Sequence, residues 1–292
     1  MTTVVDKQTL SQGARELLAA ARNVNSQCGE DGIIEAILAM LPTRDRWCVE
    51  FGAWDGRHLS NTRRLIDEAG YCAVMIEADK TSFSNLKKGF DANTNVTCLQ
   101  AFVGYNPDNG LDALLKSTPC PLDFDILSID IDGNDIHVWD AIQVYRPKLV
   151  VIEFNPRIPS AVAFTQQRNP KIKWGSSLRA LFELGLTKQY RLVCANPFNA
   201  FFVAAELWNE DYCRTADQLS SFRQEEPEPV YVFSGFDGTV HLSAECNMDW
   251  HRMKLRRENV QALPKFLRRY PLDYTWFQRH AFRIFKRFRE KL

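Results

Sequence analysis

Between residues 47 and 155, the sequence alternates short apolar runs with segments of helical periodicity. The apolar runs are nearly continuous, which is typical of strands that are buried on both faces of a sheet. Strands that alternate with helices form parallel sheets, because each helix returns the chain to the edge where the next strand begins. The predicted strands cover 47–53, 71–78, 96–104, 124–132 and 147–155, and the predicted helices cover 58–70, 81–90, 110–117 and 135–145.

The pattern changes after the fifth predicted strand. Residues 156–175 are rich in Pro, Asn, Gln and Lys, and loops of this length are often functional. A helical segment follows over 176–188. Two further apolar runs, 190–195 and 199–207, are so close together that they favour an antiparallel hairpin. We therefore expect an α/β fold with five parallel strands and an antiparallel final hairpin.

The segments that flank this sheet are different in kind. Helical periodicity precedes it over residues 8–22 and 30–40. The chain beyond residue 207 lacks the strand–helix alternation, although 229–244 has the pattern of a hairpin. The expected organisation is an N-terminal helical segment over 1–45, the α/β domain over 46–207 and a C-terminal extension over 208–292.

Composition excludes several classes of protein. With 45% hydrophobic and 25% charged residues, the chain should fold as an ordinary soluble globule, and its net charge of zero gives no argument for a nucleic-acid partner. The eight cysteines form no C-x-x-C pair and include several in apolar runs, where free thiols pack as small hydrophobes. We see no signal peptide and no apolar run long enough to span a membrane. A cytoplasmic protein is expected.

The most informative motif follows the first strand, in "VEFGAWDGRHLS". It contains Glu50, Gly52 and Gly56, and such glycines let the backbone turn sharply and approach a ligand closely. Glu77 ends the second strand, where an acid can accept hydrogen bonds from both ribose hydroxyls of a nucleoside. A tight turn without a ligand and a solvated strand-end acid would explain the same residues separately. Together they fit one nucleoside pocket.

Three acids lie at the end of the fourth strand, in "SIDIDGND". They are Asp130, Asp132 and Asp135, and carboxylates at the end of a buried strand need partners. A calcium loop is excluded, because its twelfth position would need a carboxylate and Ala141 is found there.

A divalent-metal site is the first interpretation that remains. The fifth strand ends near Glu153 and Asn155, so its oxygen atoms should lie beside those of Asp130 and Asp132. Oxygen ligands of this kind suit Mg²⁺ or Mn²⁺. A metal ion bound there would lower the pKa of a hydroxyl that it coordinates.

Two other interpretations of the acids stay open. Without a metal, Asp130 or Asp132 would act as a general base or as an orienting acceptor. Alternatively Asp132 caps the following helix and Asp135 faces water. His137, on that helix, is more typical of a packed or surface residue than of a base.

The order of elements and these motifs resemble the class I S-adenosylmethionine-dependent methyltransferases, whose sheet ends in a reversed seventh strand. Within that fold, residues 25–205 are similar to the FkbM-type O-methyltransferases, although Ser128 stands where that family commonly has lysine and Asp132 where it commonly has glutamate. The resemblance implies a Rossmann-like class I methyltransferase sheet and S-adenosylmethionine as cofactor. It assigns the methionine part of the cofactor to Glu50, Gly52 and Gly56, the ribose to Glu77, and the adenine border to Gln100 and Ala101, with Asp130 also beside the cofactor.

The implied activity is methyl transfer to a sugar hydroxyl, in surface polysaccharide or glycolipid synthesis. Asp130 and Asp132 would be catalytic, and His58 is placed near the sulfonium. Arg157 and Trp174 in the long loop would hold the acceptor by hydrogen bonding and stacking. The alternatives are an NAD-dependent sugar oxidoreductase, which the missing G-x-G-x-x-G disfavours, and a non-catalytic membrane-associated binding protein.

Residues 275–292 form the last distinctive feature. Aromatic residues recur there on one helical face and basic residues on the other, which fits the interface of an anionic membrane. A terminal helix docked on the protein's own core would have the same pattern. Nucleic acid is disfavoured, because no recognised binding fold surrounds this helix. The prediction is a cytoplasmic protein, and the sequence leaves open whether this helix places it peripherally on the inner face of the membrane or docks on the core.

Overall fold

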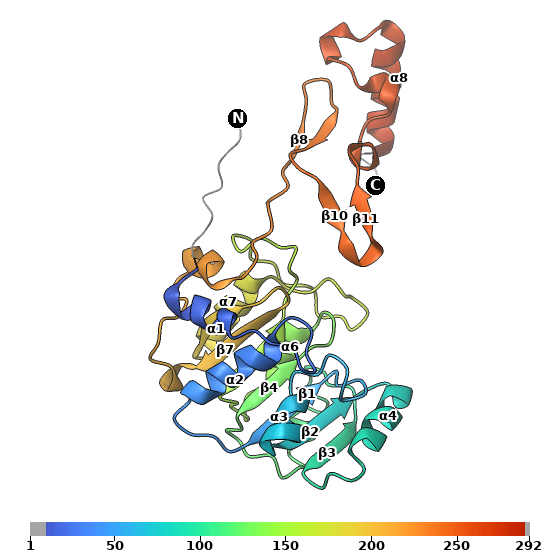
Figure 1. The fold of residues 1–292 in the computed structure, drawn as a ribbon. Coiled ribbons are helices and arrows are strands. Elements are labelled where there is room, and N and C mark those ends of the chain that lie inside the picture. Colours follow the sequence, from blue (N-terminus) through green and yellow to red (C-terminus); the bar gives the residue numbers. More distant parts are fainter. Residues whose placement is uncertain (1–9, 290–292) are drawn as a thin grey trace. The chain divides into compact units, whose positions relative to one another are not determined.

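The computed structural model describes residues 10–289 and divides them into two compact units. The first unit comprises the described residues up to Pro227, and the second begins at Glu228 (Figure 1). The boundary therefore lies later than the one expected at 207/208. Residues between the two boundaries add Trp208, Leu219 and Phe222 to the core of the first unit.

The first unit contains seven strands and seven α-helices among the described residues. The strands are β1 (Trp47–Phe51), β2 (Cys72–Glu77), β3 (Val96–Gln100), β4 (Ile126–Ile129), β5 (Leu149–Glu153), β6 (Tyr190–Ala195) and β7 (Asn199–Ala204). The helices are α1 (Gln12–Ala19), α2 (Glu30–Met40), α3 (Arg63–Ala69), α4 (Lys80–Phe90), α5 (Leu111–Leu115), α6 (Asp135–Ala141) and α7 (Leu178–Thr187). Two 3₁₀ helices, η1 (Ala205–Leu207) and η2 (Ala216–Phe222), complete it.

These strands form one sheet in the order β3-β2-β1-β4-β5-β7-β6. Strands β1 to β5 run parallel, and β7 is antiparallel to both of its neighbours. The predicted fold class, an α/β sheet of five parallel strands with an antiparallel final hairpin, is confirmed. Helix α2 crosses in front of the sheet in Figure 1 and buries its apolar side chains, including Ile33, Ile34 and Ile37.

Helices α3 and α6 are shorter than predicted, for a physical reason in each case. Helix α3 begins only at Arg63, because the preceding residues 60–62 donate hydrogen bonds to the Glu50 carboxylate. Helix α6 ends at Ala141, because the Asp112 carboxylate accepts hydrogen bonds from the three backbone N–H groups of 143–145. The Glu50 carboxylate thus competes with the start of α3, and the Asp112 carboxylate replaces the backbone carbonyls that would continue α6.

The second unit consists of short elements. Strands β8 (Val232–Ser234) and β9 (Val240–Leu242) pair as the hairpin predicted within 229–244, and β10 (Cys246–Met248) pairs with β11 (Met253–Leu255). The 3₁₀ helices η3 to η6 cover Asp249–His251, Arg257–Val260, Lys265–Leu267 and Pro271–Asp273. Helix α8 (Trp276–Arg289) ends the described chain. No helix in residues 10–289 is long and apolar enough to cross a membrane.

Buried Asp125 joins the amino-terminal end of β4 to those of β1, β2 and β5. Its carboxylate accepts hydrogen bonds from Arg46 N (3.0 Å), Tyr71 Oη (3.0 Å) and Lys148 Nζ (2.9 Å). Asp45 N donates a fourth, at 2.8 Å. Since Asp125 is fully buried, these donors replace the water that the charge would otherwise need.

We expect Asp125→Ala to lower the free energy of unfolding by about 3–5 kcal/mol, because it leaves the buried ammonium of Lys148 with one carboxylate fewer. Urea unfolding followed by circular dichroism measures the change. The matched control is Asp123→Ala, two residues earlier and exposed, for which we expect a change within about 0.5 kcal/mol. Equal effects of the two substitutions would contradict the role assigned to Asp125.

Candidate functional site at the carboxyl edge of the sheet

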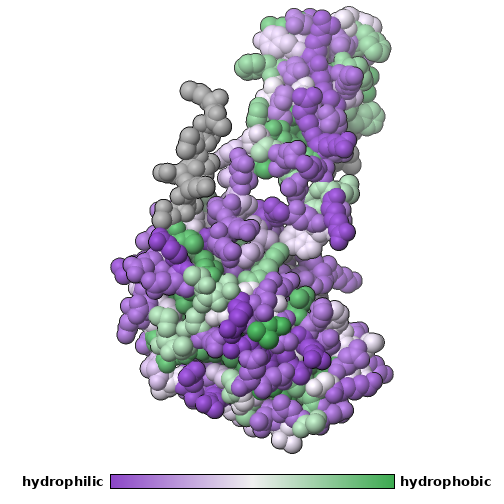
Figure 2. Space-filling model, in the orientation of Figure 1, coloured by the Kyte–Doolittle hydropathy of each residue, from purple (hydrophilic) through white to green (hydrophobic). Residues whose placement is uncertain are grey.

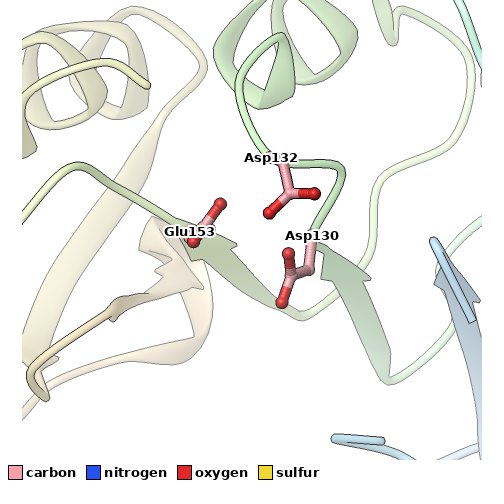
Figure 3. Close-up of side chains that lie close together, drawn as sticks. All are labelled: Asp130, Asp132 and Glu153. Carbon is pink, nitrogen blue, oxygen red and sulfur yellow. The ribbon is translucent and has the colours of Figure 1, made fainter. Parts of the chain in front are cut away.

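The carboxyl ends of the parallel strands bring the predicted site residues to one edge of the sheet. Register pairs Ile129 at the end of β4 with Ile152 of β5, so the next residues, Asp130 and Glu153, follow on neighbouring strands. Asp132 approaches from the turn after β4, and Figure 3 shows the three carboxylates pointing toward one another. An oxygen of each lies within 4.8 Å of an oxygen of the other two.

Burial and mutual repulsion disfavour the charged forms of these acids. Burial, followed by the charges of Asp135 and Asp132, raises the pKa of Asp130 to about 7. Burial, followed by the charge of Asp130, raises the pKa of Glu153 to about 9. Asp130 is thus poised to exchange a proton near neutral pH, and Glu153 keeps its proton there.

The turn after β4 is held by Asp135, which the sequence did not identify as structural. Its side chain accepts hydrogen bonds from Ile131 N (2.9 Å) and Gly133 N (2.8 Å). Asp135 is buried, so the interpretation in which it faces water is wrong. Asp132 does not cap helix α6 either, because the N-cap residue is Asn134. Burial raises the pKa of Asp135 to about 6 although both backbone donors lower it.

Asp132 has an unusual backbone conformation. Its φ angle is +57°, in the left-handed region that costs most residues other than glycine roughly 1 kcal/mol. Its side chain is exposed and forms an ion pair with Lys173, with Oδ2 and Nζ 3.0 Å apart. Asp132 is therefore the most exposed of the three carboxylates, beside the two more buried ones.

The glycine turn after β1 needs glycine at its first position. Gly52 has φ +74°, and an added Cβ would lie 1.9 Å from the carbonyl oxygen of Asp130. Gly56 also has positive φ and packs against Leu86. Between them, Trp54 N donates to Glu77 Oε2 at 2.8 Å, so the turn after β1 is joined to the end of β2.

Glu50 lies deeper than the other strand-end acids and is occupied by the protein itself. Its carboxylate accepts hydrogen bonds from Ser60 Oγ (2.6 Å), Thr62 Oγ1 (2.5 Å) and Asn61 N (3.0 Å). Burial raises its pKa, and these donors lower it. Asn61 Nδ2 also donates to Ser128 Oγ at 3.1 Å. Glu50 therefore fixes residues 60–62, which directly precede α3.

The expected adenine border lies at the end of β3. Gln100 is exposed there, and its neighbour Ala101 donates its backbone N–H to the Glu77 carbonyl at 3.1 Å. Both residues thus lie next to the acid expected to hold the ribose.

The loop 156–175 folds back onto the turn after β4. Besides the Lys173–Asp132 ion pair, Asn134 Nδ2 donates to Asn169 O at 3.0 Å. Lys173 also lowers the pKa of Glu153, against the larger effect of burial. The loop is rich in Lys, and nothing in the spacing of its lysines predicts that Lys173 is the one that reaches the acids.

The residues that organise this loop were also missed. Gln166 is 1% exposed, and its side-chain oxygen accepts hydrogen bonds from Trp174 N (3.1 Å) and Gly175 N (2.9 Å). The buried guanidinium of Arg223 donates to the carbonyls of Pro156 and Ile158, at the start of the loop. Such distant contacts leave no local pattern in the sequence.

Asn155, Arg157 and Trp174 lie at the ends of the loop. Asn155 Oδ1 accepts a hydrogen bond from Arg157 N at 2.9 Å, and Asn155 Nδ2 donates to Trp174 O at 2.7 Å. The amide of Asn155 thus clamps the two ends of the loop together. Arg157 and Trp174 are both exposed, as a residue that contacts an acceptor must be.

The two histidines have different surroundings. His58 is exposed after the glycine turn, with its ring 5.7 Å from that of Trp54. His137 is buried, and its Nε2 lies 2.7 Å from Gln166 O. Burial lowers its pKa. Its contacts make His137 a packed residue that supports the loop.

Glu30, at the start of α2, adds another carboxylate near the site. It is fully buried, and its Oε1 accepts hydrogen bonds from Asn196 Nδ2 (2.7 Å) and Asn199 Nδ2 (3.0 Å) at the turn between β6 and β7. Its charge contributes to the raised pKa of Asp130. The two partners are 166 and 169 residues away along the chain, so no local pattern in the sequence predicts them.

No protein family's sequence profile matches this chain. No curated protein matches it in sequence. Among solved structures, the fold is similar to an O-methyltransferase from Bacillus cereus in complex with S-adenosylhomocysteine (16% identity, 69% of this chain and 93% of that one, TM-score 0.42). It is also similar to a SAM-dependent methyltransferase from Aquifex aeolicus (10% identity, 65% and 98%, TM-score 0.37). Likeness at this level concerns the fold alone.

The raised pKa of Glu153 predicts a pH-dependent stability. The folded state holds the Glu153 proton up to about pH 9, whereas an unfolded glutamate loses it near its ordinary pKa of 4.5. Stability is therefore full below that ordinary value and falls as the pH rises toward 9. Glu153→Gln removes this titration. Between pH 4.5 and about pH 9, the free energy of unfolding of this variant should therefore fall by about 1–3 kcal/mol less than that of the wild type.

Urea unfolding at several pH values, with EDTA present, measures this difference. The matched control is Glu210→Gln, at an exposed position, which should follow the wild-type profile. Parallel profiles for Glu153→Gln and the wild type would show that Glu153 titrates as an ordinary acid.

Proposed function

We propose that the protein is an S-adenosylmethionine-dependent O-methyltransferase that acts on a sugar hydroxyl, as in surface polysaccharide or glycolipid synthesis. The observation that carries the proposal is the placement of a glycine turn, a β2-end acid and a carboxylate cluster at one edge of a sheet with a reversed seventh strand. Ligands of open α/β sheets bind outside the carboxyl ends of the strands. Affiliation with the FkbM-type enzymes is part of the proposal.

The cofactor side is formed by the ends of β1 to β3. Gly52 and Gly56 let the turn approach a ligand, and Glu77 faces the same edge with its carboxylate fixed by Trp54 N and Asp79 N. A carboxylate so placed can accept hydrogen bonds from ribose hydroxyls. Bound S-adenosylmethionine would supply an electrophilic methyl group.

The acceptor side is formed by β4, β5 and the loop. Asp130 has a pKa raised to about 7, so it can take a proton from an acceptor hydroxyl near neutral pH. Glu153 keeps its proton there and can donate a hydrogen bond to the acceptor. Arg157 and Trp174 are exposed beside this edge and can hydrogen-bond and stack with a sugar.

The same carboxylates fit a divalent metal. Asp130, Asp132 and Glu153 offer three oxygen ligands within 4.8 Å of one another, which is the donor set that Mg²⁺ and Mn²⁺ prefer. A bound metal ion would supply Lewis acidity toward the acceptor hydroxyl. Lys173 provides the cationic partner of Asp132 in the described structure. It would compete with the ion for this ligand.

We expect S-adenosylhomocysteine to bind the wild-type protein in calorimetry, and Glu77→Gln to weaken this binding by about tenfold or more, because the neutral amide is a poorer acceptor for ribose hydroxyls. Asp123→Asn, at an exposed position outside the site, is the charge-matched control. Absence of binding at millimolar concentration would exclude the proposed activity. Binding that is unaffected by Glu77→Gln would exclude the assigned ribose contact alone.

For the metal version, we expect Mn²⁺ to bind the wild-type protein, as followed by electron paramagnetic resonance. Asp132→Asn should weaken binding by about tenfold or more, since it removes a charged ligand. Lys173→Met should strengthen it, because a competing ammonium is lost. The control is Lys171→Met in the same loop, which should change little. No Mn²⁺ binding by any variant would leave Asp130 as the base without a metal.

A further inference from the structure

Helix α8 is fixed to the preceding part of the second unit by one side only. Gln278 Nε2 donates to Phe266 O at 2.8 Å, and Arg279 Nε donates to Tyr274 O at 3.1 Å. The ring of Phe282 packs edge-on against Tyr274, with centroids 5.8 Å apart. These three contacts orient the helix within its own unit and determine which face it presents outward.

An open apolar groove lies along α8, between the helix and the segment that precedes it. The groove has a volume of about 540 Å³, and every residue that lines it lies between 264 and 288. The helix contributes Trp276, Phe277, Ile284 and Phe288, and the segment before it contributes Phe266. Figure 2 shows hydrophobic residues, in green, beside hydrophilic ones on this unit.

These large side chains are exposed to an extent that is uncommon for a soluble surface. Trp276 is 79%, Phe277 67% and Phe288 72% exposed, and no residue of α8 is buried. Contiguous apolar patches of this kind mark an interaction surface, since leaving aromatic rings in water is costly.

The charge around the groove is almost entirely positive. Residues 265–289 contain eight Lys or Arg residues and a single acid, Asp273. At 100° per residue, Arg279, Arg283, Lys286 and Arg287 lie on the side of α8 away from Phe277, Ile284 and Phe288, and Trp276 lies among these basic residues. The helix thus has a basic face and an aromatic face.

We propose that α8 and its apolar groove dock the protein on the surface of an anionic lipid bilayer. The aromatic face would enter the boundary between head groups and acyl chains, while the basic side chains reach lipid phosphates. The charge pattern favours lipid over protein, because the near-absence of acids suits a uniformly anionic plane, whereas protein surfaces mix both signs. This inference does not depend on the proposed activity.

The dimensions of the helix fit this orientation. Its 14 residues extend about 21 Å at 1.5 Å per residue, and it is too short and too charged to span a bilayer. A helix lying in the interface plane keeps both faces in a suitable environment. Docking would thus be peripheral and reversible, and dependent on salt.

Flotation of the full chain with vesicles tests the proposal. We expect binding to phosphatidylcholine vesicles that contain phosphatidylglycerol, with at least about tenfold weaker binding to phosphatidylcholine alone. Raising the NaCl concentration should release the protein. Arg283→Glu with Arg287→Glu should weaken binding by at least about tenfold, whereas Arg283→Lys with Arg287→Lys should preserve it.

Two further variants separate lipid docking from general charge effects. Phe277→Ser with Phe288→Ser should also weaken binding by about tenfold or more, since it removes apolar surface and leaves the charge unchanged. Lys87→Glu with Lys116→Glu alters exposed lysines of the first unit, changes the net charge equally to the arginine reversal and should bind like the wild type. Circular dichroism should show unchanged helix content in all variants.

Three outcomes would overturn the proposal. One is absence of binding to anionic vesicles at low salt, and another is equal binding by the wild type and the Phe277/Phe288 variant. The third is a concentration-dependent dimer in sedimentation that the Phe277/Phe288 variant abolishes while vesicle binding is absent, which would make the groove an interface between two copies. S-adenosylhomocysteine binding by every variant should equal that of the wild type, so failure here is distinguishable from failure of the proposed activity.

Discussion

The parallel register of β1, β4 and β5 is the constraint on which the site depends. Parallel strands in register have their carboxyl ends at the same edge of the sheet. Asp130 and Glu153, which come next after the paired residues of β4 and β5, must therefore lie at that edge. Asp125 fixes the opposite edge through its hydrogen bonds, and the glycine turn fills the space beside Asp130. Asp130 and Glu153 therefore cannot move apart without disturbing the sheet, whereas Asp132 belongs to the turn beyond β4.

The clustered carboxylates are stabilised in different ways. Glu50 and Asp135 are satisfied by hydroxyl and backbone donors, so their burial serves local structure. Asp130 and Glu153 have raised pKa values, and Asp132 has Lys173 as its ion-pair partner. The site therefore favours binding of a positively charged group, which can be a proton, an ammonium or a metal ion. The metal-free and the metal-dependent mechanism both neutralise the same cluster of carboxylates.

The sheet and its edge were predictable from the sequence because period and spacing are local signals. Apolar runs located every strand of the main sheet, and the acids at their ends predicted that Asp130 would approach Glu153. The contribution of Lys173 was not predictable, because a loop of 20 residues has no period that says which lysine folds back. The buried role of Asp135 was missed for another reason, since a side chain that bonds its own turn resembles a solvated one in the sequence.

The pairing of Glu30 with Asn196 and Asn199 has a consequence for how the chain is made. These partners are 166 and 169 residues apart, so helix α2 leaves the ribosome long before the turn that satisfies its carboxylate has been synthesised. Until then its buried isoleucines have no completed sheet to cover them, and contacts of such long range form slowly. The first unit must therefore finish folding late in translation, and nascent chains that stop before Asn199 would be natural substrates for chaperones.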